Sequence, residues 1–170
     1  MDNREIIMTA MRNQGAADAQ RLRERAVAGT ADGTEVIANE ACVPTWTMKD
    51  YSAVPVGSPY QYEGQLYKLW QQHDATGQVD WSPDKAVSLW DIYHTKDPDK
   101  AKPYVAPQGT RGMYQTGEVC STEAGVWQCN VDNCITSPDA KASDWTLIVP
   151  AETEDAEETV TAEPDGGTEE

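Results

Sequence analysis

The first part of the chain follows a helical pattern. Apolar and small residues recur at helical spacing through residues 2–28, and the run AADAQRLRERA consists of strong helix formers. Gly29 is expected to end this helix, and a second short helix is expected over 32–42. Neither helix has enough apolar surface to fold alone. Residues 1–45 are therefore predicted to be a helical arm, either mobile or used for attachment or oligomerisation.

Beyond the arm, the pattern changes to short strands. Aromatic and aliphatic residues alternate in SPYQYEGQLYKLWQQH (58–73) about a Glu63-Gly64 turn, which predicts a β-hairpin. The run AVSLWDIY supplies a further strand, so 46–93 is predicted to be a first module. Residues 94–110 are rich in Pro and Lys with little to bury, and are predicted to be a linker.

A weak internal repeat follows the linker, with an offset of about 60 residues. The corresponding features are Gly57 and Gly117, Tyr67 and Trp127, the Ser-Pro-Asp runs at 82–84 and 137–139, and Trp90 and Trp145. Residues 111–149 are therefore predicted to be a second, divergent module. The expected fold class is mainly β, with two small three-stranded antiparallel modules in tandem, the helical arm before them and a disordered acidic tail, 150–170, after them.

The aromatic composition indicates how these modules are built. Phe is absent, whereas six Trp and seven Tyr all lie between residues 46 and 148, so nearly every large ring also carries a polar atom. The repeat-matched rings are expected in the cores, and these are Tyr67, Trp90, Trp127 and Trp145. Tyr62, Trp70 and Trp81 have no clear repeat partner, and either core packing or exposure fits them.

The charge is concentrated at one end of the chain. Nine of the 29 acidic residues, and no basic residue, fall in 151–170, so more than half of the net charge of −16 lies there. Such an acidic balance disfavours nucleic acids and anionic membranes as partners, because both would repel it. No apolar run of 18 residues and no Sec-type signal are present, so we expect a protein made in the cytoplasm that does not span a membrane.

The sequence contains no established catalytic motif. GxSxG, HExxH, P-loop and GxGxxG patterns are missing, so no enzyme activity, catalytic residue or cofactor is expected. A glycosidase would need two carboxylates flanking a sugar, for which the alternatives are Asp80 with Asp84 or Asp132 with Asp139. Turn and cap roles are the preferred interpretation of these residues.

Three of the four cysteines crowd into one short segment. A bridge between Cys129 and Cys134, a bridge between Cys120 and Cys129, and reduced thiols are all compatible with the sequence, and the fourth cysteine is Cys42. The spacing lacks a CxxC pair and neighbouring histidines, so no metal site is expected.

Sugar binding requires planar rings that stack on a pyranose, with amide or carboxylate groups nearby. Both predicted modules offer that combination. The candidate carbohydrate-binding residues are Tyr62, Trp70, Gln72, Trp81, Trp127 and Asn130.

The segment GSPYQYEGQLYKLWQQHDATGQVDWSPDKAVSLWDIY resembles the chitin-binding type 3 modules of carbohydrate-binding module families 5 and 12, in the branch that occurs in phage and prophage tail-region proteins. The matching features are YxGQLYK, QxH, DWSPD and SLW, and 104–148 looks like a divergent copy. The resemblance covers about 35–148. It implies a compact three-stranded β fold, carbohydrate binding, and frequent attachment to glycoside hydrolases.

One feature departs from the family pattern. Chitinase-borne members carry two adjacent aromatic residues after the hairpin Tyr, where this chain has Gln71 and Gln72. The leading hypothesis is a non-catalytic accessory protein of a phage or prophage, in a virion or extracellular, that binds chitin or a host cell-wall glycan. The alternative is a structural virion component, in a tail fibre, baseplate or capsid decoration, that contacts other virion proteins through the N-terminal helix. Homo-oligomerisation is compatible with both.

Overall fold

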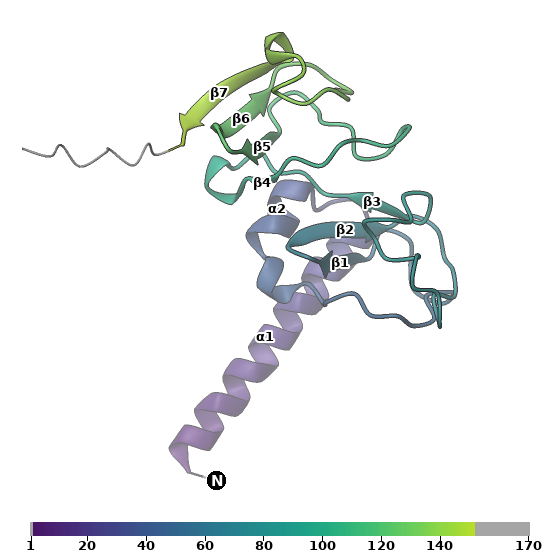
Figure 1. Cartoon of the computed structure of the whole chain (residues 1–170). Coiled ribbons are helices and arrows are strands. Elements are labelled where there is room, and N and C mark those ends of the chain that lie inside the picture. Colours follow the sequence, from purple (N-terminus) through teal and green to yellow (C-terminus); the bar gives the residue numbers. More distant parts are fainter. Residues whose placement is uncertain (1, 152–170) are drawn as a thin grey trace, which may run out of the picture.

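The computed structural model describes residues 2–151, in which a long N-terminal helix projects from a body that contains two β-sheets (Figure 1). The helices are α1 (Asn3–Val27), α2 (Gly33–Ala38) and the 3₁₀ helices η1 (Glu40–Cys42), η2 (Pro98–Lys100) and η3 (Ala142–Asp144). The first sheet contains β1 (Pro59–Tyr62), β2 (Gln65–Leu69) and β3 (Trp90–Ile92). The second contains β4 (Lys102–Pro103), β5 (Val119–Thr122), β6 (Gly125–Cys129) and β7 (Trp145–Pro150).

Helix α1 confirms the expected N-terminal helix. Asp2 and Glu5 form a capping box, in which each side chain accepts a hydrogen bond from the other residue's backbone N–H. The helix ends before Gly29, whose φ of +69° suits glycine. Its first four turns are exposed, whereas Leu22 and Ala26 near its C-terminus are buried.

The end of α1 and all of α2 share a core with the first sheet. Val36 and Ile37 of α2 are fully buried and pack in one cluster with Leu66 of β2 and Tyr93, which follows β3. Burial of these side chains supplies the apolar contact that the helices lack on their own. Only the N-terminal part of α1 therefore stands clear of the body (Figure 1).

The predicted hairpin is present, with β1 and β2 joined by Glu63 and Gly64 at φ values of +47° and +78°. Two consecutive positive φ values are those of a type I′ turn, which matches the twist of the strands. The sheet face opposite the helices is covered by rings packed edge to face. Tyr51 lies 5.2 Å, between centroids, from both Tyr60 and Trp90. The first sheet is thus enclosed between helices and an aromatic layer.

The two sheets repeat one three-strand meander. Tyr60 pairs with Tyr67 across the first hairpin, and Cys120 pairs with Trp127 across the second, at the same offset of about 60 residues. The closing tryptophans are held alike. The indole N–H of Trp90 donates to the Trp81 carbonyl at 3.3 Å, and that of Trp145 donates to the Thr136 carbonyl at 3.0 Å.

The expectation of two three-stranded antiparallel modules was wrong for the second one. Its sheet has four strands, because β4 from the predicted linker runs parallel to β5. Two contacts hold β4 in place: Gln65 Nε2 donates to the Pro103 carbonyl at 3.0 Å, and the Tyr104 ring stacks on Tyr114 at 5.5 Å. With 25 residues in α1 and at most six in any strand, the described fold is mixed α/β rather than mainly β. The predicted disordered tail lies, from residue 152 onward, outside the described residues.

Candidate functional site

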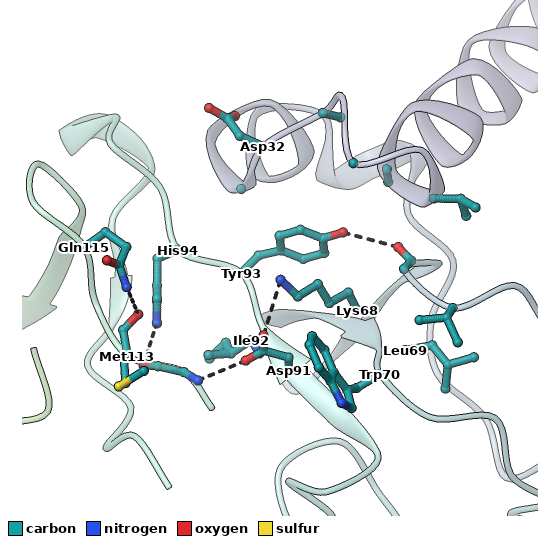
Figure 2. Close-up of a pocket in the computed structure, with 18 of the residues that line it drawn as sticks. Asp32, Lys68, Leu69, Trp70, Asp91, Ile92, Tyr93, His94, Met113 and Gln115 are labelled. Carbon is teal, nitrogen blue, oxygen red and sulfur yellow. Dashed lines mark hydrogen bonds and ion pairs between the residues drawn. The ribbon is translucent and has the colours of Figure 1, made fainter. Parts of the chain in front are cut away.

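A cleft of about 550 Å³ lies where α1, α2, the first sheet and the segment 110–118 meet (Figure 2). One wall comes from the end of α1 and the start of α2, and a second from the ends of β2 and β3. The third wall belongs to the second module. Residues more than 80 positions apart in the sequence therefore surround one space.

His94 holds the two modules together beside this cleft. Its Nε2 donates to the Gly112 carbonyl at 2.9 Å, and its ring stacks on Tyr114 with 3.7 Å between centroids. The Gly112 N–H in turn donates to Asp91 Oδ1 at 2.9 Å (Figure 2). Burial lowers the pKa of His94 to about 4. The Gly112 hydrogen bond and the charge of Asp91 raise this pKa, but by less than burial lowers it. The imidazole is therefore neutral near pH 7.

Helix α2 approaches the segment after β3 so closely that only glycine fits at position 33. A Cβ on Gly33 would lie 2.0 Å from the His94 carbonyl oxygen. The contact continues one residue on, where Thr34 Oγ1 accepts a hydrogen bond from the Lys96 N–H at 3.0 Å. The cleft wall formed by α2 is thereby fixed to the segment that follows β3.

The floor of the cleft carries an ion pair and a tyrosine. Lys68 Nζ lies 3.3 Å from Asp91 Oδ2 and 5.5 Å from the centroid of the Tyr93 ring. The Tyr93 hydroxyl donates to the Gly57 carbonyl at 3.3 Å, and burial raises its pKa to about 12, so the phenol stays neutral. Figure 2 shows these side chains side by side. They offer fixed hydrogen-bond donors and acceptors to a ligand.

The second module adds two polar side chains. Glu118 accepts a hydrogen bond from the Gln115 N–H at 2.7 Å, and burial raises the pKa of this carboxyl. Gln115 also donates, through its side-chain amide, to the Met113 carbonyl at 3.4 Å (Figure 2). With Asp32 and Asp91, Glu118 gives the cleft three carboxyl groups against the single lysine Lys68.

Trp70 is the predicted binding residue that lines this cleft. Its side chain is 43% exposed, and the Arg111 guanidinium carbon lies 3.4 Å from the ring centroid. This cation–π contact covers one ring face and fixes the orientation of the indole. The exposed part of the side chain is available for contact with a ligand.

The structure does not bring the other predicted binding residues to the cleft. Tyr62 lies at the hairpin end of the first sheet, half-buried against Trp46, and Trp81 is 37% exposed in the loop between β2 and β3. Gln72 donates to the Val54 carbonyl at 2.8 Å. Trp127 and Asn130 lie on the second module, where they bond to Thr122 and Thr146 respectively. The six residues thus form no single platform.

Core packing is as expected at three of the four repeat-matched rings. Tyr67, Trp90 and Trp145 are buried, whereas Trp127 is only half-buried. The exposure of Trp70 decides between the two interpretations left open for it from sequence, in favour of a surface position.

Sequence reasoning missed the polar residues of the cleft. Lys68 and Asp91 are direct cross-strand partners in the first sheet, so their opposite charges in two predicted strands were a usable signal. Gln115 and Glu118 carried no such signal. Their place in the cleft depends on how the second module packs against the first.

Three of the four carboxylates considered for glycoside hydrolysis make a polar contact with another side chain or with the backbone. Asp84 accepts a hydrogen bond from the Ser82 hydroxyl at 2.5 Å, and Asp132 accepts one from the Thr116 N–H at 3.0 Å. Asp80 lies exposed beside Lys85. The Asp84 contact is a local turn contact of the kind that such residues commonly make, whereas Asp132 joins two loops that are 16 positions apart in the sequence.

All four cysteines are free thiols in the structure, which corresponds to the reduced alternative. Cys120, Cys129 and Cys134 are buried in the core of the second module, at 1%, 1% and 4% exposure. Within residues 2–151, no three His, Cys, Asp or Glu side chains are arranged to hold a metal ion.

Comparison with protein-family models and with curated proteins finds no match to this chain. In the part of the chain that the structure describes, no helix combines the length and apolar character needed to span a bilayer.

Proposed function

We propose that this chain is a non-catalytic carbohydrate-binding accessory protein, and that the cleft between its modules is the binding site. The observation that carries the proposal is the position of Trp70, an exposed indole fixed on the wall of a cleft with Lys68, Asp91 and Gln115. An oriented ring beside convergent hydrogen-bonding groups is the combination that a pyranose requires.

The chemistry of the cleft favours a neutral or amino-sugar glycan. Three carboxyl groups face one lysine, so an acidic polysaccharide would meet net repulsion. A volume of about 550 Å³ lies within the range of sites that bind small ligands, which suits a short stretch of glycan. The resemblance of 57–93 to chitin-binding modules supports chitin or a cell-wall glycan as ligand, and a phage or prophage, virion or extracellular, as context.

Binding is tested by sedimentation of the full chain with insoluble chitin, peptidoglycan and host wall polysaccharide. Trp70→Ala is expected to weaken binding about 30-fold, the cost of removing a central anchor of roughly 2 kcal/mol. Trp81→Ala tests the loop surface instead, and Ile135→Ala, at a 62% exposed position of the second module, is the control.

The three variants separate the outcomes. Loss with Trp70→Ala alone supports the cleft, whereas loss with Trp81→Ala alone assigns binding to the loop surface. A folded protein that is retained on none of the three materials contradicts the proposed function.

A structural role in a virion is a second candidate, favoured by the exposed end of α1. Ile6, Ile7, Met8 and Met11 are 46–65% exposed on a helix segment, 2–16, in which every residue is exposed. Such a segment suits attachment to another virion protein. Removing residues 2–16 is expected to leave the body folded and to abolish incorporation into particles. Full incorporation of the shortened chain would contradict this role.

A further inference from the structure

Cysteines occupy core positions of the second module where the first module has larger side chains. Equivalent backbone hydrogen bonds, with N···O distances between 2.7 and 3.0 Å, identify the equivalent positions in the two modules. They run from the Tyr51 N–H to the His73 carbonyl and from the Tyr114 N–H to the Cys134 carbonyl, and from the Gly57 N–H to the Leu69 carbonyl and from the Gly117 N–H to the Cys129 carbonyl. Cys134 and Cys129 therefore take the places of His73 and Leu69.

These replacements leave the second core with little apolar volume. In the first module the His73 ring stacks on Tyr51 with 5.3 Å between centroids, and Leu69 is fully buried. The buried cluster of the second module consists of Tyr114, Trp145 and the three cysteines of that module. Small modules with so limited a core are commonly supplemented by a disulfide.

Cys129 and Cys134 are the pair of cysteines placed to form one. Their thiols lie within hydrogen-bonding reach of each other. The Cys129 thiol donates to the Val131 carbonyl at 3.1 Å, so its side chain is turned over the short loop that leads to Cys134. By contrast, Cys120 lies on the neighbouring strand β5, and Cys42 packs against the core of the first module.

Both cysteines also support the third wall of the cleft. The Cys129 N–H donates to the Glu118 carbonyl at 2.8 Å, and the Cys134 N–H donates to the Tyr114 carbonyl at 2.8 Å. Segment 114–118, which runs between these two attachments, carries the Gln115 and Glu118 side chains of the cleft. A bond between the two cysteines therefore joins the two supports of one wall.

We propose that Cys129 and Cys134 form a disulfide when the chain meets an oxidising environment, and that this disulfide holds segment 114–118 in place. The structure with free thiols is then the reduced form. Environments of this kind lie outside the reducing cytoplasm. The proposal concerns the wall itself and does not depend on what the cleft binds.

The oxidant is a small-molecule disulfide, for which oxidised glutathione is the probe. One cysteine thiolate attacks it, which forms a mixed disulfide and releases one glutathione. The second cysteine thiolate then attacks the mixed disulfide, so the protein S–S bond forms and the other glutathione leaves. The two cysteines lose two electrons, and their two protons end on the released glutathiones.

The exchange requires a thiolate, which burial disfavours in the folded protein. Burial raises the pKa of the Cys129 thiol to about 11, and the neighbouring Cys134 raises it further in the same direction. The disulfide is therefore expected to form while the chain folds, and the test starts from unfolded protein.

The full chain is unfolded in urea and refolded with a mixture of reduced and oxidised glutathione, beside a sample refolded with reduced glutathione alone. The number of thiols that react in urea is expected to fall from four to two. Cleavage after Glu123 and Asp132 separates the three cysteines of the second module, so mass spectrometry identifies the linked peptides. The expected link joins the peptides that contain Cys129 and Cys134.

Hydrogen exchange tests the effect on the cleft wall. The amides of Gly117, Cys129 and Cys134 are expected to exchange at least about 10-fold more slowly in the oxidised protein than in the reduced one. Cys134→Ala should abolish this difference, and Cys129→Ala replaces it if that variant fails to fold. Cys42→Ala, which alters a cysteine of the first module, is the matched control and should keep the difference.

Three outcomes overturn the proposal. In the first, four thiols remain after refolding with oxidised glutathione. In the second, the disulfide includes Cys120 or Cys42. In the third, the expected disulfide forms but the exchange of the wall amides is unchanged. None of these measurements uses a glycan, so a failure of the proposed function is distinguished from a failure of this proposal.

Discussion

We predict that protein stability is sensitive to acid at the junction of the two modules, because of His94. Its pKa is lowered to about 4 in the folded protein, from an ordinary value of 6.5. Below pH 6.5 the unfolded chain takes up a proton that the folded chain does not. The free energy of unfolding should therefore fall as the pH drops from 6.5 to 4, and this histidine's contribution should change no further below that value.

The magnitude follows from the size of the shift. One pKa unit corresponds to about 1.36 kcal/mol, so the change from 6.5 to about 4 amounts to about 3 kcal/mol at most. Glu118 acts in the opposite direction, because burial raises its pKa and the folded state then gains stability as this carboxyl is protonated. A comparison between variants is therefore more informative than the wild-type profile alone.

The measurement is urea unfolding at a series of pH values, followed by tryptophan fluorescence. His94→Gln removes the titrating group and keeps a hydrogen-bond donor, so its stability should change less between pH 6.5 and 4 than that of the wild type. Gln108→Ala alters an exposed residue near the same junction and should keep the wild-type profile. Parallel profiles for His94→Gln and the wild type would refute the reasoning.

Two further predictions concern packing and thiol chemistry. Gly33→Ala should destabilise the fold by about 2–3 kcal/mol, because the added Cβ meets the His94 carbonyl. Gly15→Ala, in the exposed part of α1, should instead stabilise the fold by up to about 1 kcal/mol. Equal effects of the two substitutions on thermal unfolding would contradict this prediction. At pH 8 an aromatic disulfide reagent should quickly modify only the half-buried Cys42, because the other three cysteines are buried. Burial also raises the pKa of the Cys120 thiol to about 12 and that of the Cys129 thiol to about 11, so little reactive thiolate forms at pH 8. All four thiols should react in urea, and equal rates for all four in the native protein would refute the assignment.

Local sequence patterns predicted the parts of the fold that depend on local physics. The helix-forming run before Gly29 and the hairpin at Glu63 and Gly64 require only neighbouring residues. Strand β4 was missed because it has two residues, includes Pro103 and pairs with a strand 18 positions later. Nothing in its own composition favours a strand.

The candidate site was predictable only in part. Trp70 was recognised as a ring without a repeat partner, and its exposure agrees with a binding role. Its contact with Arg111 was not foreseen, because the arginine lies 41 positions away, at the first residue of the predicted second module. The polar groups of the cleft come from two modules, and a pattern within one module does not report how modules pack.

The position of residues 105–112 beside β3 has a consequence for synthesis on the ribosome. The strands of the first module end at Ile92, but Val105 and Arg111 line a small cavity beside that strand, and Gly112 bonds to Asp91 and His94. The first module therefore acquires its full set of contacts only after about 20 more residues have emerged. A nascent chain that stops before Gly112 would leave Tyr67 and Ile92 more accessible to other chains. Residues 105–112 therefore complete the packing of a module that was synthesised before them.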